Sequence, residues 1–334
     1  MNTVIIAEAG VNHNGNLEMA KKLIEVAALS GADFVKFQTF DAKRLVTKTA
    51  GRAPYQKNNN SEFQTQFEMI KKLELTKPMH VELIEEARSY GIGFLSTSFD
   101  IESTKFLSSL GQDLFKIPSG EITNLPYLRH VGGLSKSIFL STGMSTLEEV
   151  RKAVEVLIES GTAKSNITVL HCTSSYPAPV SDVNLKAMLT LKNNLGVKIG
   201  YSDHTLGTEI ALAAVVLGAT VLEKHFTLDK NLPGPDHKAS LEPNELKLMV
   251  SQIRNVEEAF GDGIKRPMPS EIENLVAARK SIVAKRPISE GEYFSEENLT
   301  TKRPGMGINP MEWDRIIGGK ARRIFDTDEM IDEE

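Results

Sequence analysis

The chain has 334 residues, of which 40% are hydrophobic and 25% charged, and its formal net charge is −5 at pH 7. This composition is typical of a globular protein with one large domain and a smaller one, or with two modest domains. The negative net charge argues against non-specific binding of nucleic acid, which needs a dense basic surface. Cys172 is the only cysteine, so an intrachain disulfide is excluded, and no apolar run approaches the length of a membrane span. Without a recognisable signal peptide, we expect a cytoplasmic protein with neither membrane nor nucleic-acid partners.

Eight short apolar runs, each ending in polar residues, recur over the first 227 residues. In chain order they are TVIIAEAG, DFVKFQTF, IGFLSTSF, DLFKIPSG, SIFLSTGM, ITVLHCTS, KIGYSDHT and TVLEKHFT. Amphipathic segments lie between and after them, and several end on a glycine, at residues 17–31, 78–91, 146–161, 208–218 and 245–261. Alternating strands and helices predict a parallel sheet, and eight such units predict a closed (β/α)₈ TIM barrel. A doubly wound open sheet is the structural alternative.

Two parts of the chain depart from this alternation. Residues 41–76 form the longest interruption, and long insertions after a barrel strand commonly lie over the active-site mouth. After Gly261 a polar stretch with prolines begins, and we interpret residues 263–276 as a linker. It would join a barrel domain of residues 1–262 to a small β-rich domain of residues 277–334, whose size is near the lower limit for independent folding.

The carboxyl ends of the predicted strands hold the candidate site residues, because these ends surround the active site in TIM barrels. The polar residues at or just after these ends are Glu8, Lys36, Gln38, Thr97, Lys116, Ser119, Glu121, Ser141, Ser202, His204, Glu223 and His225.

Two histidines, His204 and His225, follow the seventh and eighth predicted strands, which would be neighbours in the barrel. Side chains alternate along a strand, so Glu223 shares a face with His225. Two imidazoles with a nearby carboxylate suit Mn²⁺, Fe²⁺, Co²⁺ or Zn²⁺. The alternative is that both histidines are hydrogen-bonded, partly buried residues without a metal.

Two lysines, Lys36 and Lys116, interrupt apolar runs, although lysine is rarely buried unless it is paired. Two ammonium groups in one mouth, together with the hydroxyls at the strand ends, would favour a phosphate or a carboxylate. The alternative is that each lysine pairs with a structural carboxylate, Glu8 or Glu121 for instance. The strand ends thus predict a metal-assisted barrel enzyme with an anionic substrate, and they leave the reaction open.

Seven motifs along the whole chain resemble those of the sialic acid synthase family. They are IIAEAGVNHNGN, GADFVKFQTF, FKIPSGEITNLP, LSTGMST, YSDHTLG, the pair LEKHFTLDK and GPDHKAS, and TTKRPGMGINP. The C-terminal part resembles type III antifreeze protein, an antifreeze-like (SAF) domain. The resemblance implies condensation of phosphoenolpyruvate with an open-chain N-acylated amino sugar, which gives a nine-carbon 2-keto acid and phosphate.

The resemblance also implies roles for individual residues. Phosphoenolpyruvate would be held by Lys36, Thr97, Lys116, Ser119, Ser141 and Ser202. His204 and His225 would bind Mn²⁺, with Mg²⁺ or Co²⁺ as alternatives, and Tyr176, Asp236 and Arg303 would contact the sugar. Glu8, Glu121 and Lys116 would form the catalytic set, in which Glu121 handles protons or positions water. Arg303 would reach the acyl group from the antifreeze-like domain, which by this resemblance would cover the partner's barrel in a domain-swapped homodimer.

The choice of sugar depends on finer features of the motifs. Ser174 stands where the N-acetylneuraminate type tends to have asparagine, and LDKNLPGPDHKASLEP and RPGMGI look closer to the legionaminate branch. We therefore expect 2,4-diacetamido-2,4,6-trideoxy-mannose as substrate and N,N′-diacetyllegionaminate as product, with N-acetylmannosamine and N-acetylneuraminate as the alternative. A barrel acting on phosphorylated aldoses, like those that make 3-deoxy-octulosonate 8-phosphate, is disfavoured by the antifreeze-like tail. A non-catalytic carbohydrate-binding protein is disfavoured by the retained lysines, histidines and hydroxyls.

Overall fold

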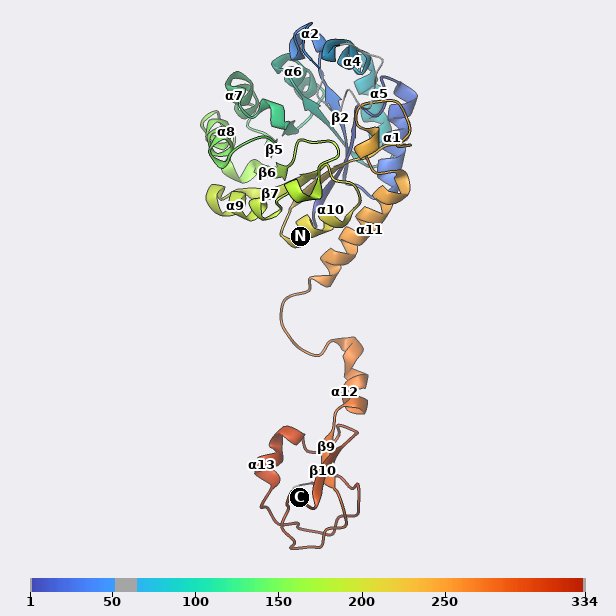
Figure 1. Cartoon of the computed structure of the whole chain (residues 1–334), viewed down its shortest axis with the longest axis vertical. Coiled ribbons are helices and arrows are strands. Elements are labelled where there is room, and N and C mark those ends of the chain that lie inside the picture. The colour runs from blue at the N-terminus through green and yellow to red at the C-terminus, as the bar shows by residue number, and fades with distance from the viewer. Residues whose placement is uncertain (1, 52–64, 333–334) are drawn as a thin grey trace. The chain divides into compact units, whose positions relative to one another are not determined.

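A computed structural model describes residues 2–51 and 65–332, and the chain divides into two compact units, Met1–Phe260 and Gly261–Glu334 (Figure 1). Among the helices in these described ranges, none is both long and apolar enough to cross a membrane.

The first unit contains all eight predicted strands in one parallel sheet. The strands are β1 (Val4–Gly10), β2 (Phe34–Thr39), β3 (Gly93–Ser98), β4 (Leu114–Ile117), β5 (Ser137–Ser141), β6 (Ile167–Cys172), β7 (Lys198–Asp203) and β8 (Val221–His225). Their order in the sheet is β3-β2-β1-β8-β7-β6-β5-β4, and every hydrogen-bonded neighbour is parallel. The two end strands, β3 and β4, also contact each other. The sheet therefore curls into a near-closed barrel, which confirms the predicted fold and excludes the open sheet.

A glutamine side chain bridges the junction between β3 and β4. The backbone N–H of Ser96 donates to Oε1 of Gln112 at 3.0 Å, and Nε2 of Gln112 donates to the Ser96 carbonyl at 3.0 Å. The primary amide therefore makes the pair of hydrogen bonds that the backbone of a neighbouring strand would make.

Helices surround the strands (Figure 1). The predicted helical segments correspond to α1 (Leu17–Leu29), α5 (Lys77–Ser89), α8 (Leu147–Glu159), α10 (Glu209–Val216) and α11 (Pro243–Ala259). Three further helices that were not singled out in the sequence complete the alternation, namely α6 (Ile101–Ser109), α7 (Leu125–Gly133) and α9 (Lys186–Leu195). With nine or ten residues, these helices are shorter than α1, α5, α8 and α11, and α7 ends in two glycines, so their periodic signal is weaker.

Side chains of the barrel strands alternate between two hydrophobic layers. Ile5 and Ala7 of β1 pack toward the helices, whereas Ile6 joins an inner cluster with Leu95, Phe139, Leu170 and Val221. Because the period along a strand is two residues, Glu8 follows Ile6 on the inner face. The inner apolar cluster therefore lies below the polar strand ends.

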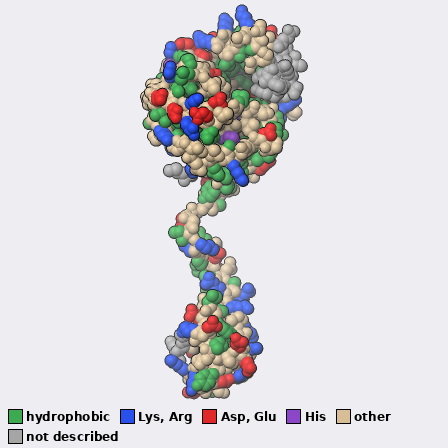
Figure 2. All heavy atoms as spheres, turned by 60° about the vertical axis from the view of Figure 1, so that its left-hand side comes forward, with side chains coloured by type: hydrophobic (Ala, Val, Ile, Leu, Met, Phe, Trp, Pro, Cys, Tyr) green, Lys and Arg blue, Asp and Glu red, His purple; other side chains and the backbone are tan. Residues whose placement is uncertain are grey.

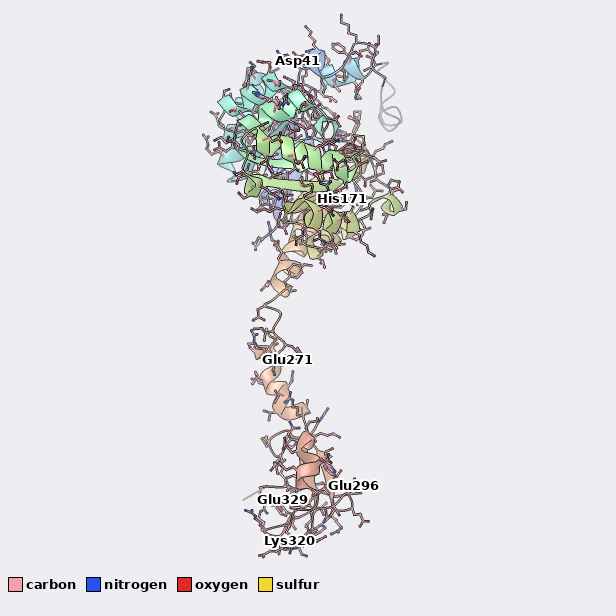
Figure 3. The ribbon with its side chains drawn as sticks, turned by 90° about the vertical axis from the view of Figure 1, so that its left-hand side faces the viewer. Asp41, His171, Glu271, Glu296, Lys320 and Glu329 are labelled. Carbon is pink, nitrogen blue, oxygen red and sulfur yellow. The ribbon has the colours of Figure 1, made fainter. Side chains whose placement is uncertain are left out.

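The insertion after β2 contains helices α2 (Ala42–Leu45) and α4 (Gln66–Lys72), while residues 52–64 lie outside the described part of the chain. Asp41, labelled in Figure 3, caps α2 by accepting a hydrogen bond from the backbone N–H of Lys43. Thr65 and Glu68 form a capping box at the start of α4.

The second unit is small and rich in turns and short strands, as the sequence predicts. Strands β9 (Ser281–Ala284) and β10 (Leu299–Lys302) pair antiparallel, and helices α12 (Ile272–Ala278) and α13 (Trp313–Ile316) flank them in the chain. Its core is a separate cluster that includes Ile282, Phe294 and Phe325. The stretch read as a linker is not entirely irregular, because α12 begins within it. Charged side chains of both signs are interspersed on the face of the molecule that Figure 2 shows.

We predict that Gln112→Ala lowers the free energy of unfolding by about 1–3 kcal/mol, because two hydrogen bonds worth about 0.5–1.5 kcal/mol each are lost. Urea unfolding followed by circular dichroism measures this change. Gln112→Glu keeps the acceptor for the Ser96 N–H but replaces the donor to the Ser96 carbonyl by a second acceptor, so this matched variant should lose stability as well. An alanine variant as stable as the wild type would contradict a role for Gln112 in closing the barrel.

Candidate active site

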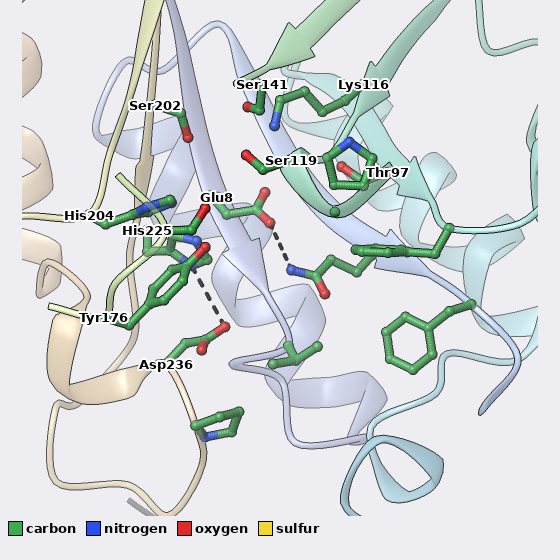
Figure 4. A pocket seen from close by; sticks show the side chains of 18 of the residues that line it. Glu8, Thr97, Lys116, Ser119, Ser141, Tyr176, Ser202, His204, His225 and Asp236 are labelled. Carbon is green, nitrogen blue, oxygen red and sulfur yellow. Dashed lines mark hydrogen bonds and ion pairs between the residues drawn. The ribbon is translucent and has the colours of Figure 1, made fainter. Parts of the chain in front are cut away.

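A cavity of about 440 Å³ lies at the carboxyl ends of the barrel strands, within the size range of small-molecule sites (Figure 4). Most of the predicted site residues line it. These are Glu8, Lys36, Thr97, Lys116, Ser119, Ser141, Tyr176, Ser202, His204, His225 and Asp236. Residues that are far apart in the sequence are thus brought to one place by the common direction of the strands.

Four buried charged side chains form what we call the charged floor, which consists of Glu8, Lys36, Lys116 and Glu223. Nζ of Lys36 lies 2.8 Å from Oε2 of Glu8 and 3.6 Å from Oε2 of Glu223. Nζ of Lys116 donates to Oε1 of Glu223 at 3.1 Å. The alternative prediction, that each buried lysine pairs with a carboxylate, therefore agrees with the structure. Lys116, however, pairs with Glu223 rather than with Glu121. Glu223 was noted only as a neighbour of His225 in the sequence, yet it joins both lysines.

The two carboxyls of the charged floor titrate very differently. Burial, and to a smaller extent the neighbouring Glu223, raise the pKa of Glu8 to about 7 against the opposing effect of Lys36. Burial would also raise the pKa of Glu223, but Lys116 and Lys36 more than offset this and lower it to about 2. At neutral pH two ammonium groups therefore face one full and one partial carboxylate charge. The net charge of the floor is positive, which favours an anion.

Two hydroxyls are bonded to the charged floor. Thr97 Oγ1 accepts a hydrogen bond from Nζ of Lys36 at 2.7 Å, and Ser202 Oγ donates to Oε1 of Glu223 at 3.0 Å. Strand register explains the second contact, because Ser202 and Glu223 are paired on β7 and β8. These bonds hold the charged groups in fixed positions.

Two other hydroxyls are available to a ligand. Ser141 Oγ is buried and has no hydrogen-bond partner among the described residues. A buried hydroxyl without a partner is costly, so this atom indicates a missing polar ligand. Ser119 Oγ accepts from the backbone N–H of Gly143 at 2.9 Å and lies 3.2 Å from Cys172 Sγ. A Cβ at Gly143 would lie 2.9 Å from this hydroxyl, so the close approach requires glycine.

The two histidines lie side by side, with ring centroids 5.5 Å apart (Figure 4). Nδ1 of His204 is 2.6 Å from the carbonyl oxygen of Thr173, so Nδ1 carries the proton and Nε2 keeps its lone pair. Nδ1 of His225 is buried without a hydrogen-bond partner in the described structure. Burial lowers the pKa of His204 to about 4 and the pKa of His225 well below its ordinary value, so both rings are neutral at pH 7.

A neutral imidazole with a free lone pair is the form that binds a metal ion, so His204 and His225 fit the predicted role. Three or more histidine, cysteine or carboxylate side chains do not come together as a preformed metal cluster anywhere in residues 2–51 and 65–332. The chain therefore offers two nitrogen ligands, and other ligands would have to come from substrate or water.

The predicted sugar contacts Tyr176 and Asp236 border the histidine pair. The ring of Tyr176 lies 4.2 Å from that of His204, centroid to centroid. Oδ2 of Asp236 is 4.0 Å from Nδ1 of His225, and burial raises the pKa of Asp236 to about 6. These groups form a polar side of the cavity next to the histidines.

Two predicted site residues are not placed with the others. Glu121 is half-buried, accepts a hydrogen bond from Asn124 at 2.6 Å, and is not among the residues that line the cavity. Arg303 belongs to the second unit, where its Nε donates to the carbonyl of Ala278 at 2.9 Å. Their roles remain predictions.

The charged tripeptide at the end of β8 is divided between the two faces of the strand. Glu223 and His225 point into the cavity, whereas Lys224 points outward and donates to Oδ2 of Asp203 at 2.6 Å and to the Thr205 carbonyl at 2.7 Å. Both side chains of the Lys224–Asp203 pair are buried. This pair therefore holds β7 to β8 behind the two histidines.

Comparisons with known proteins agree with this architecture and site. The model described as the NeuB family matches residues 23–265, and the SAF domain model matches residues 279–334. An N,N′-diacetyllegionaminic acid synthase of Campylobacter jejuni subsp. jejuni is 56% identical over 331 residues, 99% of each chain. One from Legionella pneumophila subsp. pneumophila is 50% identical over 96% of this chain and 90% of its own.

A solved structure supports the same assignment. The N-acetylneuraminic acid (sialic acid) synthetase of Leptospira borgpetersenii, crystallised with citrate, superposes with a TM-score of 0.72 at 33% identity, over 82% of this chain and 90% of that one. The molecule is thus a barrel synthase with a C-terminal SAF domain, and the chain belongs to the NeuB family. The resemblance to the sialic acid synthase family found in the sequence is confirmed.

We predict that Asp203→Asn destabilises the fold by about 3–5 kcal/mol, because the ammonium of Lys224 stays buried without its carboxylate. Chemical denaturation measures the loss. Adding Lys224→Met to Asp203→Asn removes the unpaired charge, and the double variant should regain part of the stability. A double variant no more stable than Asp203→Asn alone would contradict this interpretation.

Proposed function

We propose that this chain condenses phosphoenolpyruvate with 2,4-diacetamido-2,4,6-trideoxy-mannose to give N,N′-diacetyllegionaminate and phosphate. The observation that carries the chemistry is a pair of buried lysines, Lys36 and Lys116, beside two neutral histidines. Lys36 donates to the hydroxyl of Thr97, and Lys116 donates to the carboxylate of Glu223. The choice of sugar rests on the relatives that are 56% and 50% identical.

Phosphoenolpyruvate would lie on the charged floor. Its phosphate and carboxylate would be held by Lys36, Thr97, Lys116, Ser119, Ser141 and Ser202. The net positive charge of the floor favours this anion, and the unpartnered hydroxyl of Ser141 is ready to donate to it. Binding would let the lysines exchange part of their pairing with Glu8 and Glu223 for the ligand oxygens.

The open-chain sugar would enter with its aldehyde toward His204 and His225. Mn²⁺, or Mg²⁺ or Co²⁺ in its place, would act as a Lewis acid on the aldehyde oxygen when bound by these histidines. Asp236 and Tyr176, next to the histidines, would hold the hydroxyls of the sugar.

The reaction joins C3 of phosphoenolpyruvate to C1 of the aldehyde, and the aldehyde oxygen takes up a proton. Glu8, with its pKa near 7, would exchange that proton at neutral pH. Water then adds at C2 and loses a proton, and phosphate leaves with cleavage of its bond to C2, which gives the 2-keto acid. Lys116 and Lys36 would stabilise the negative charge on the departing phosphate. Glu121 stays a proposed proton carrier or water-positioning residue.

We also propose the assembly and location that the family resemblance implies. The catalytic barrel would comprise residues 1–262, the linker residues 263–276 and the SAF domain residues 277–334. In a domain-swapped homodimer in the cytoplasm, Arg303 of one SAF domain would reach the acyl group of the sugar in the partner's barrel.

The proposed function predicts phosphate release from phosphoenolpyruvate with Mn²⁺ and 2,4-diacetamido-2,4,6-trideoxy-mannose, at a higher kcat/KM than with N-acetylmannosamine. A continuous phosphate assay and mass spectrometry of the nine-carbon product measure this preference. A preference for N-acetylmannosamine would make the chain an N-acetylneuraminate synthase with the same fold and floor. Phosphate release with neither sugar would contradict the proposed reaction.

We predict that His225→Ala abolishes tight binding of Mn²⁺ and lowers phosphate release by more than about 100-fold, since changes one shell further out already cost about 10–100-fold. Electron paramagnetic resonance of free Mn²⁺ measures binding independently of turnover. His130→Ala, which changes a histidine of α7 that does not line the cavity, is the control. Undiminished turnover of the His225 variant in the presence of a chelator would contradict the metal role.

A further inference from the structure

One side of the cavity is apolar, in contrast to the floor and the histidine side. It is formed by Val11, Phe40, Met69, Ile70, Leu73 and Phe99, which we call the apolar wall. These residues belong to one hydrophobic cluster that is separate from the clusters of the barrel core. Met69 and Ile70 of α4 and Leu73 at its C-cap, which come from the insertion, therefore meet loops that follow the barrel strands.

The apolar wall continues the same strand faces that build the charged floor. Lys36, Gln38 and Phe40 follow one another with a period of two, so they lie on one face as β2 rises toward the mouth. On the neighbouring strand β3, Thr97 is followed in the same way by Phe99. Gln38 and Thr97 are register partners, and both strands thus change from polar to aromatic at the same height.

The apolar wall is packed rather than loose. The rings of Phe40 and Phe99 meet edge to face, with centroids 5.9 Å apart and an interplanar angle of 85°. Met69 is 1% exposed, and Ile70 and Leu73 are also buried. Such a surface excludes water and offers dispersion contacts to a methyl group, but a hydroxyl buried against it gives up its bonds to water.

We propose that the apolar wall binds the C6 methyl end of the open-chain sugar and thereby selects a 6-deoxy substrate over its 6-hydroxy counterpart. This inference rests on the proposed function and deepens it. The aldehyde end must meet phosphoenolpyruvate on the charged floor beside His204 and His225, so the far end of the sugar has to leave the floor. Asp236 and Tyr176 continue the polar side of the cavity, which suits hydroxyls. The wall beside β2 and β3 is the side that suits a methyl group.

The size of the selection follows from the chemistry of the wall. An apolar pocket discriminates against one added hydroxyl by about 10²-fold at most, since partial hydration relieves the penalty. A polar group placed in the wall at the methyl site should remove much of this discrimination. It should leave the charged floor unaffected, because Lys36 of the floor lies four residues before Phe40 of the wall in the chain.

The test compares 2,4-diacetamido-2,4,6-trideoxy-mannose with 2,4-diacetamido-2,4-dideoxy-mannose, which differs only by the C6 hydroxyl. We expect Met69→Gln to lower the ratio of kcat/KM for the deoxy over the hydroxy sugar by about tenfold. Met69→Leu, which stays apolar, should keep the ratio of the wild type. The KM for phosphoenolpyruvate should stay the same in both variants.

A second pair of variants, at Phe99, tests the apolar wall if a polar residue at the buried Met69 prevents folding. Phe99 is half-buried, and Phe99→Tyr adds one hydroxyl to the wall while Phe99→Leu keeps it apolar. The tyrosine variant should shift the ratio in the same direction as Met69→Gln, and the leucine variant should not. Equal losses of kcat/KM with both sugars would overturn this inference, and so would a wild type without preference for the deoxy sugar. In either case turnover of the sugars would still support the proposed reaction. No turnover of either sugar by the wild type would overturn the proposed function and this inference with it.

Discussion

The charged floor is the constraint on which the rest of the site depends. Two lysines can be buried in a barrel only when carboxylates share their charge, and Glu223 serves both of them. Because Glu8, with a pKa of about 7, is only partly ionised at neutral pH, the four groups keep a small positive surplus that an anion can use. The inner apolar cluster below the floor and the hydroxyls around it hold the four charged side chains at one level of the barrel.

The alternation of strand side chains assigns opposite tasks to adjacent residues. Glu223 and His225 take part in the cavity, while Lys224, between them, forms a buried ion pair with Asp203 behind it. Glu223 and His225 thus build the site, while Lys224 fastens the same strand end to the neighbouring strand β7. The neutrality of both histidines follows from the same burial, which makes an imidazolium ion costly there.

The cavity has two parts with different tasks. The charged floor and the two histidines carry the chemistry, and the apolar wall selects the sugar. The floor and the histidines are supplied by barrel strands, whereas the apolar wall requires α4 from the insertion after β2. A scaffold of this kind can keep one reaction and change its sugar by changing the wall. This division agrees with the general rule that barrel strands carry catalysis while the loops that follow them vary.

The eight strands, the barrel and the strand-end residues could be predicted from the sequence alone. Hydrophobic periodicity and the order of strands and helices along the chain can both be read directly from it. Thus Lys36, His204 and His225 could be predicted as cavity residues. Which charges pair could not be predicted from the sequence, since Glu223 meets Lys116 across the barrel from a position 107 residues away. The tertiary structure also turned Glu121 toward Asn124 and brought the insertion against the cavity. Pairing and orientation depend on distances between strands and loops, and those distances arise only when the barrel closes.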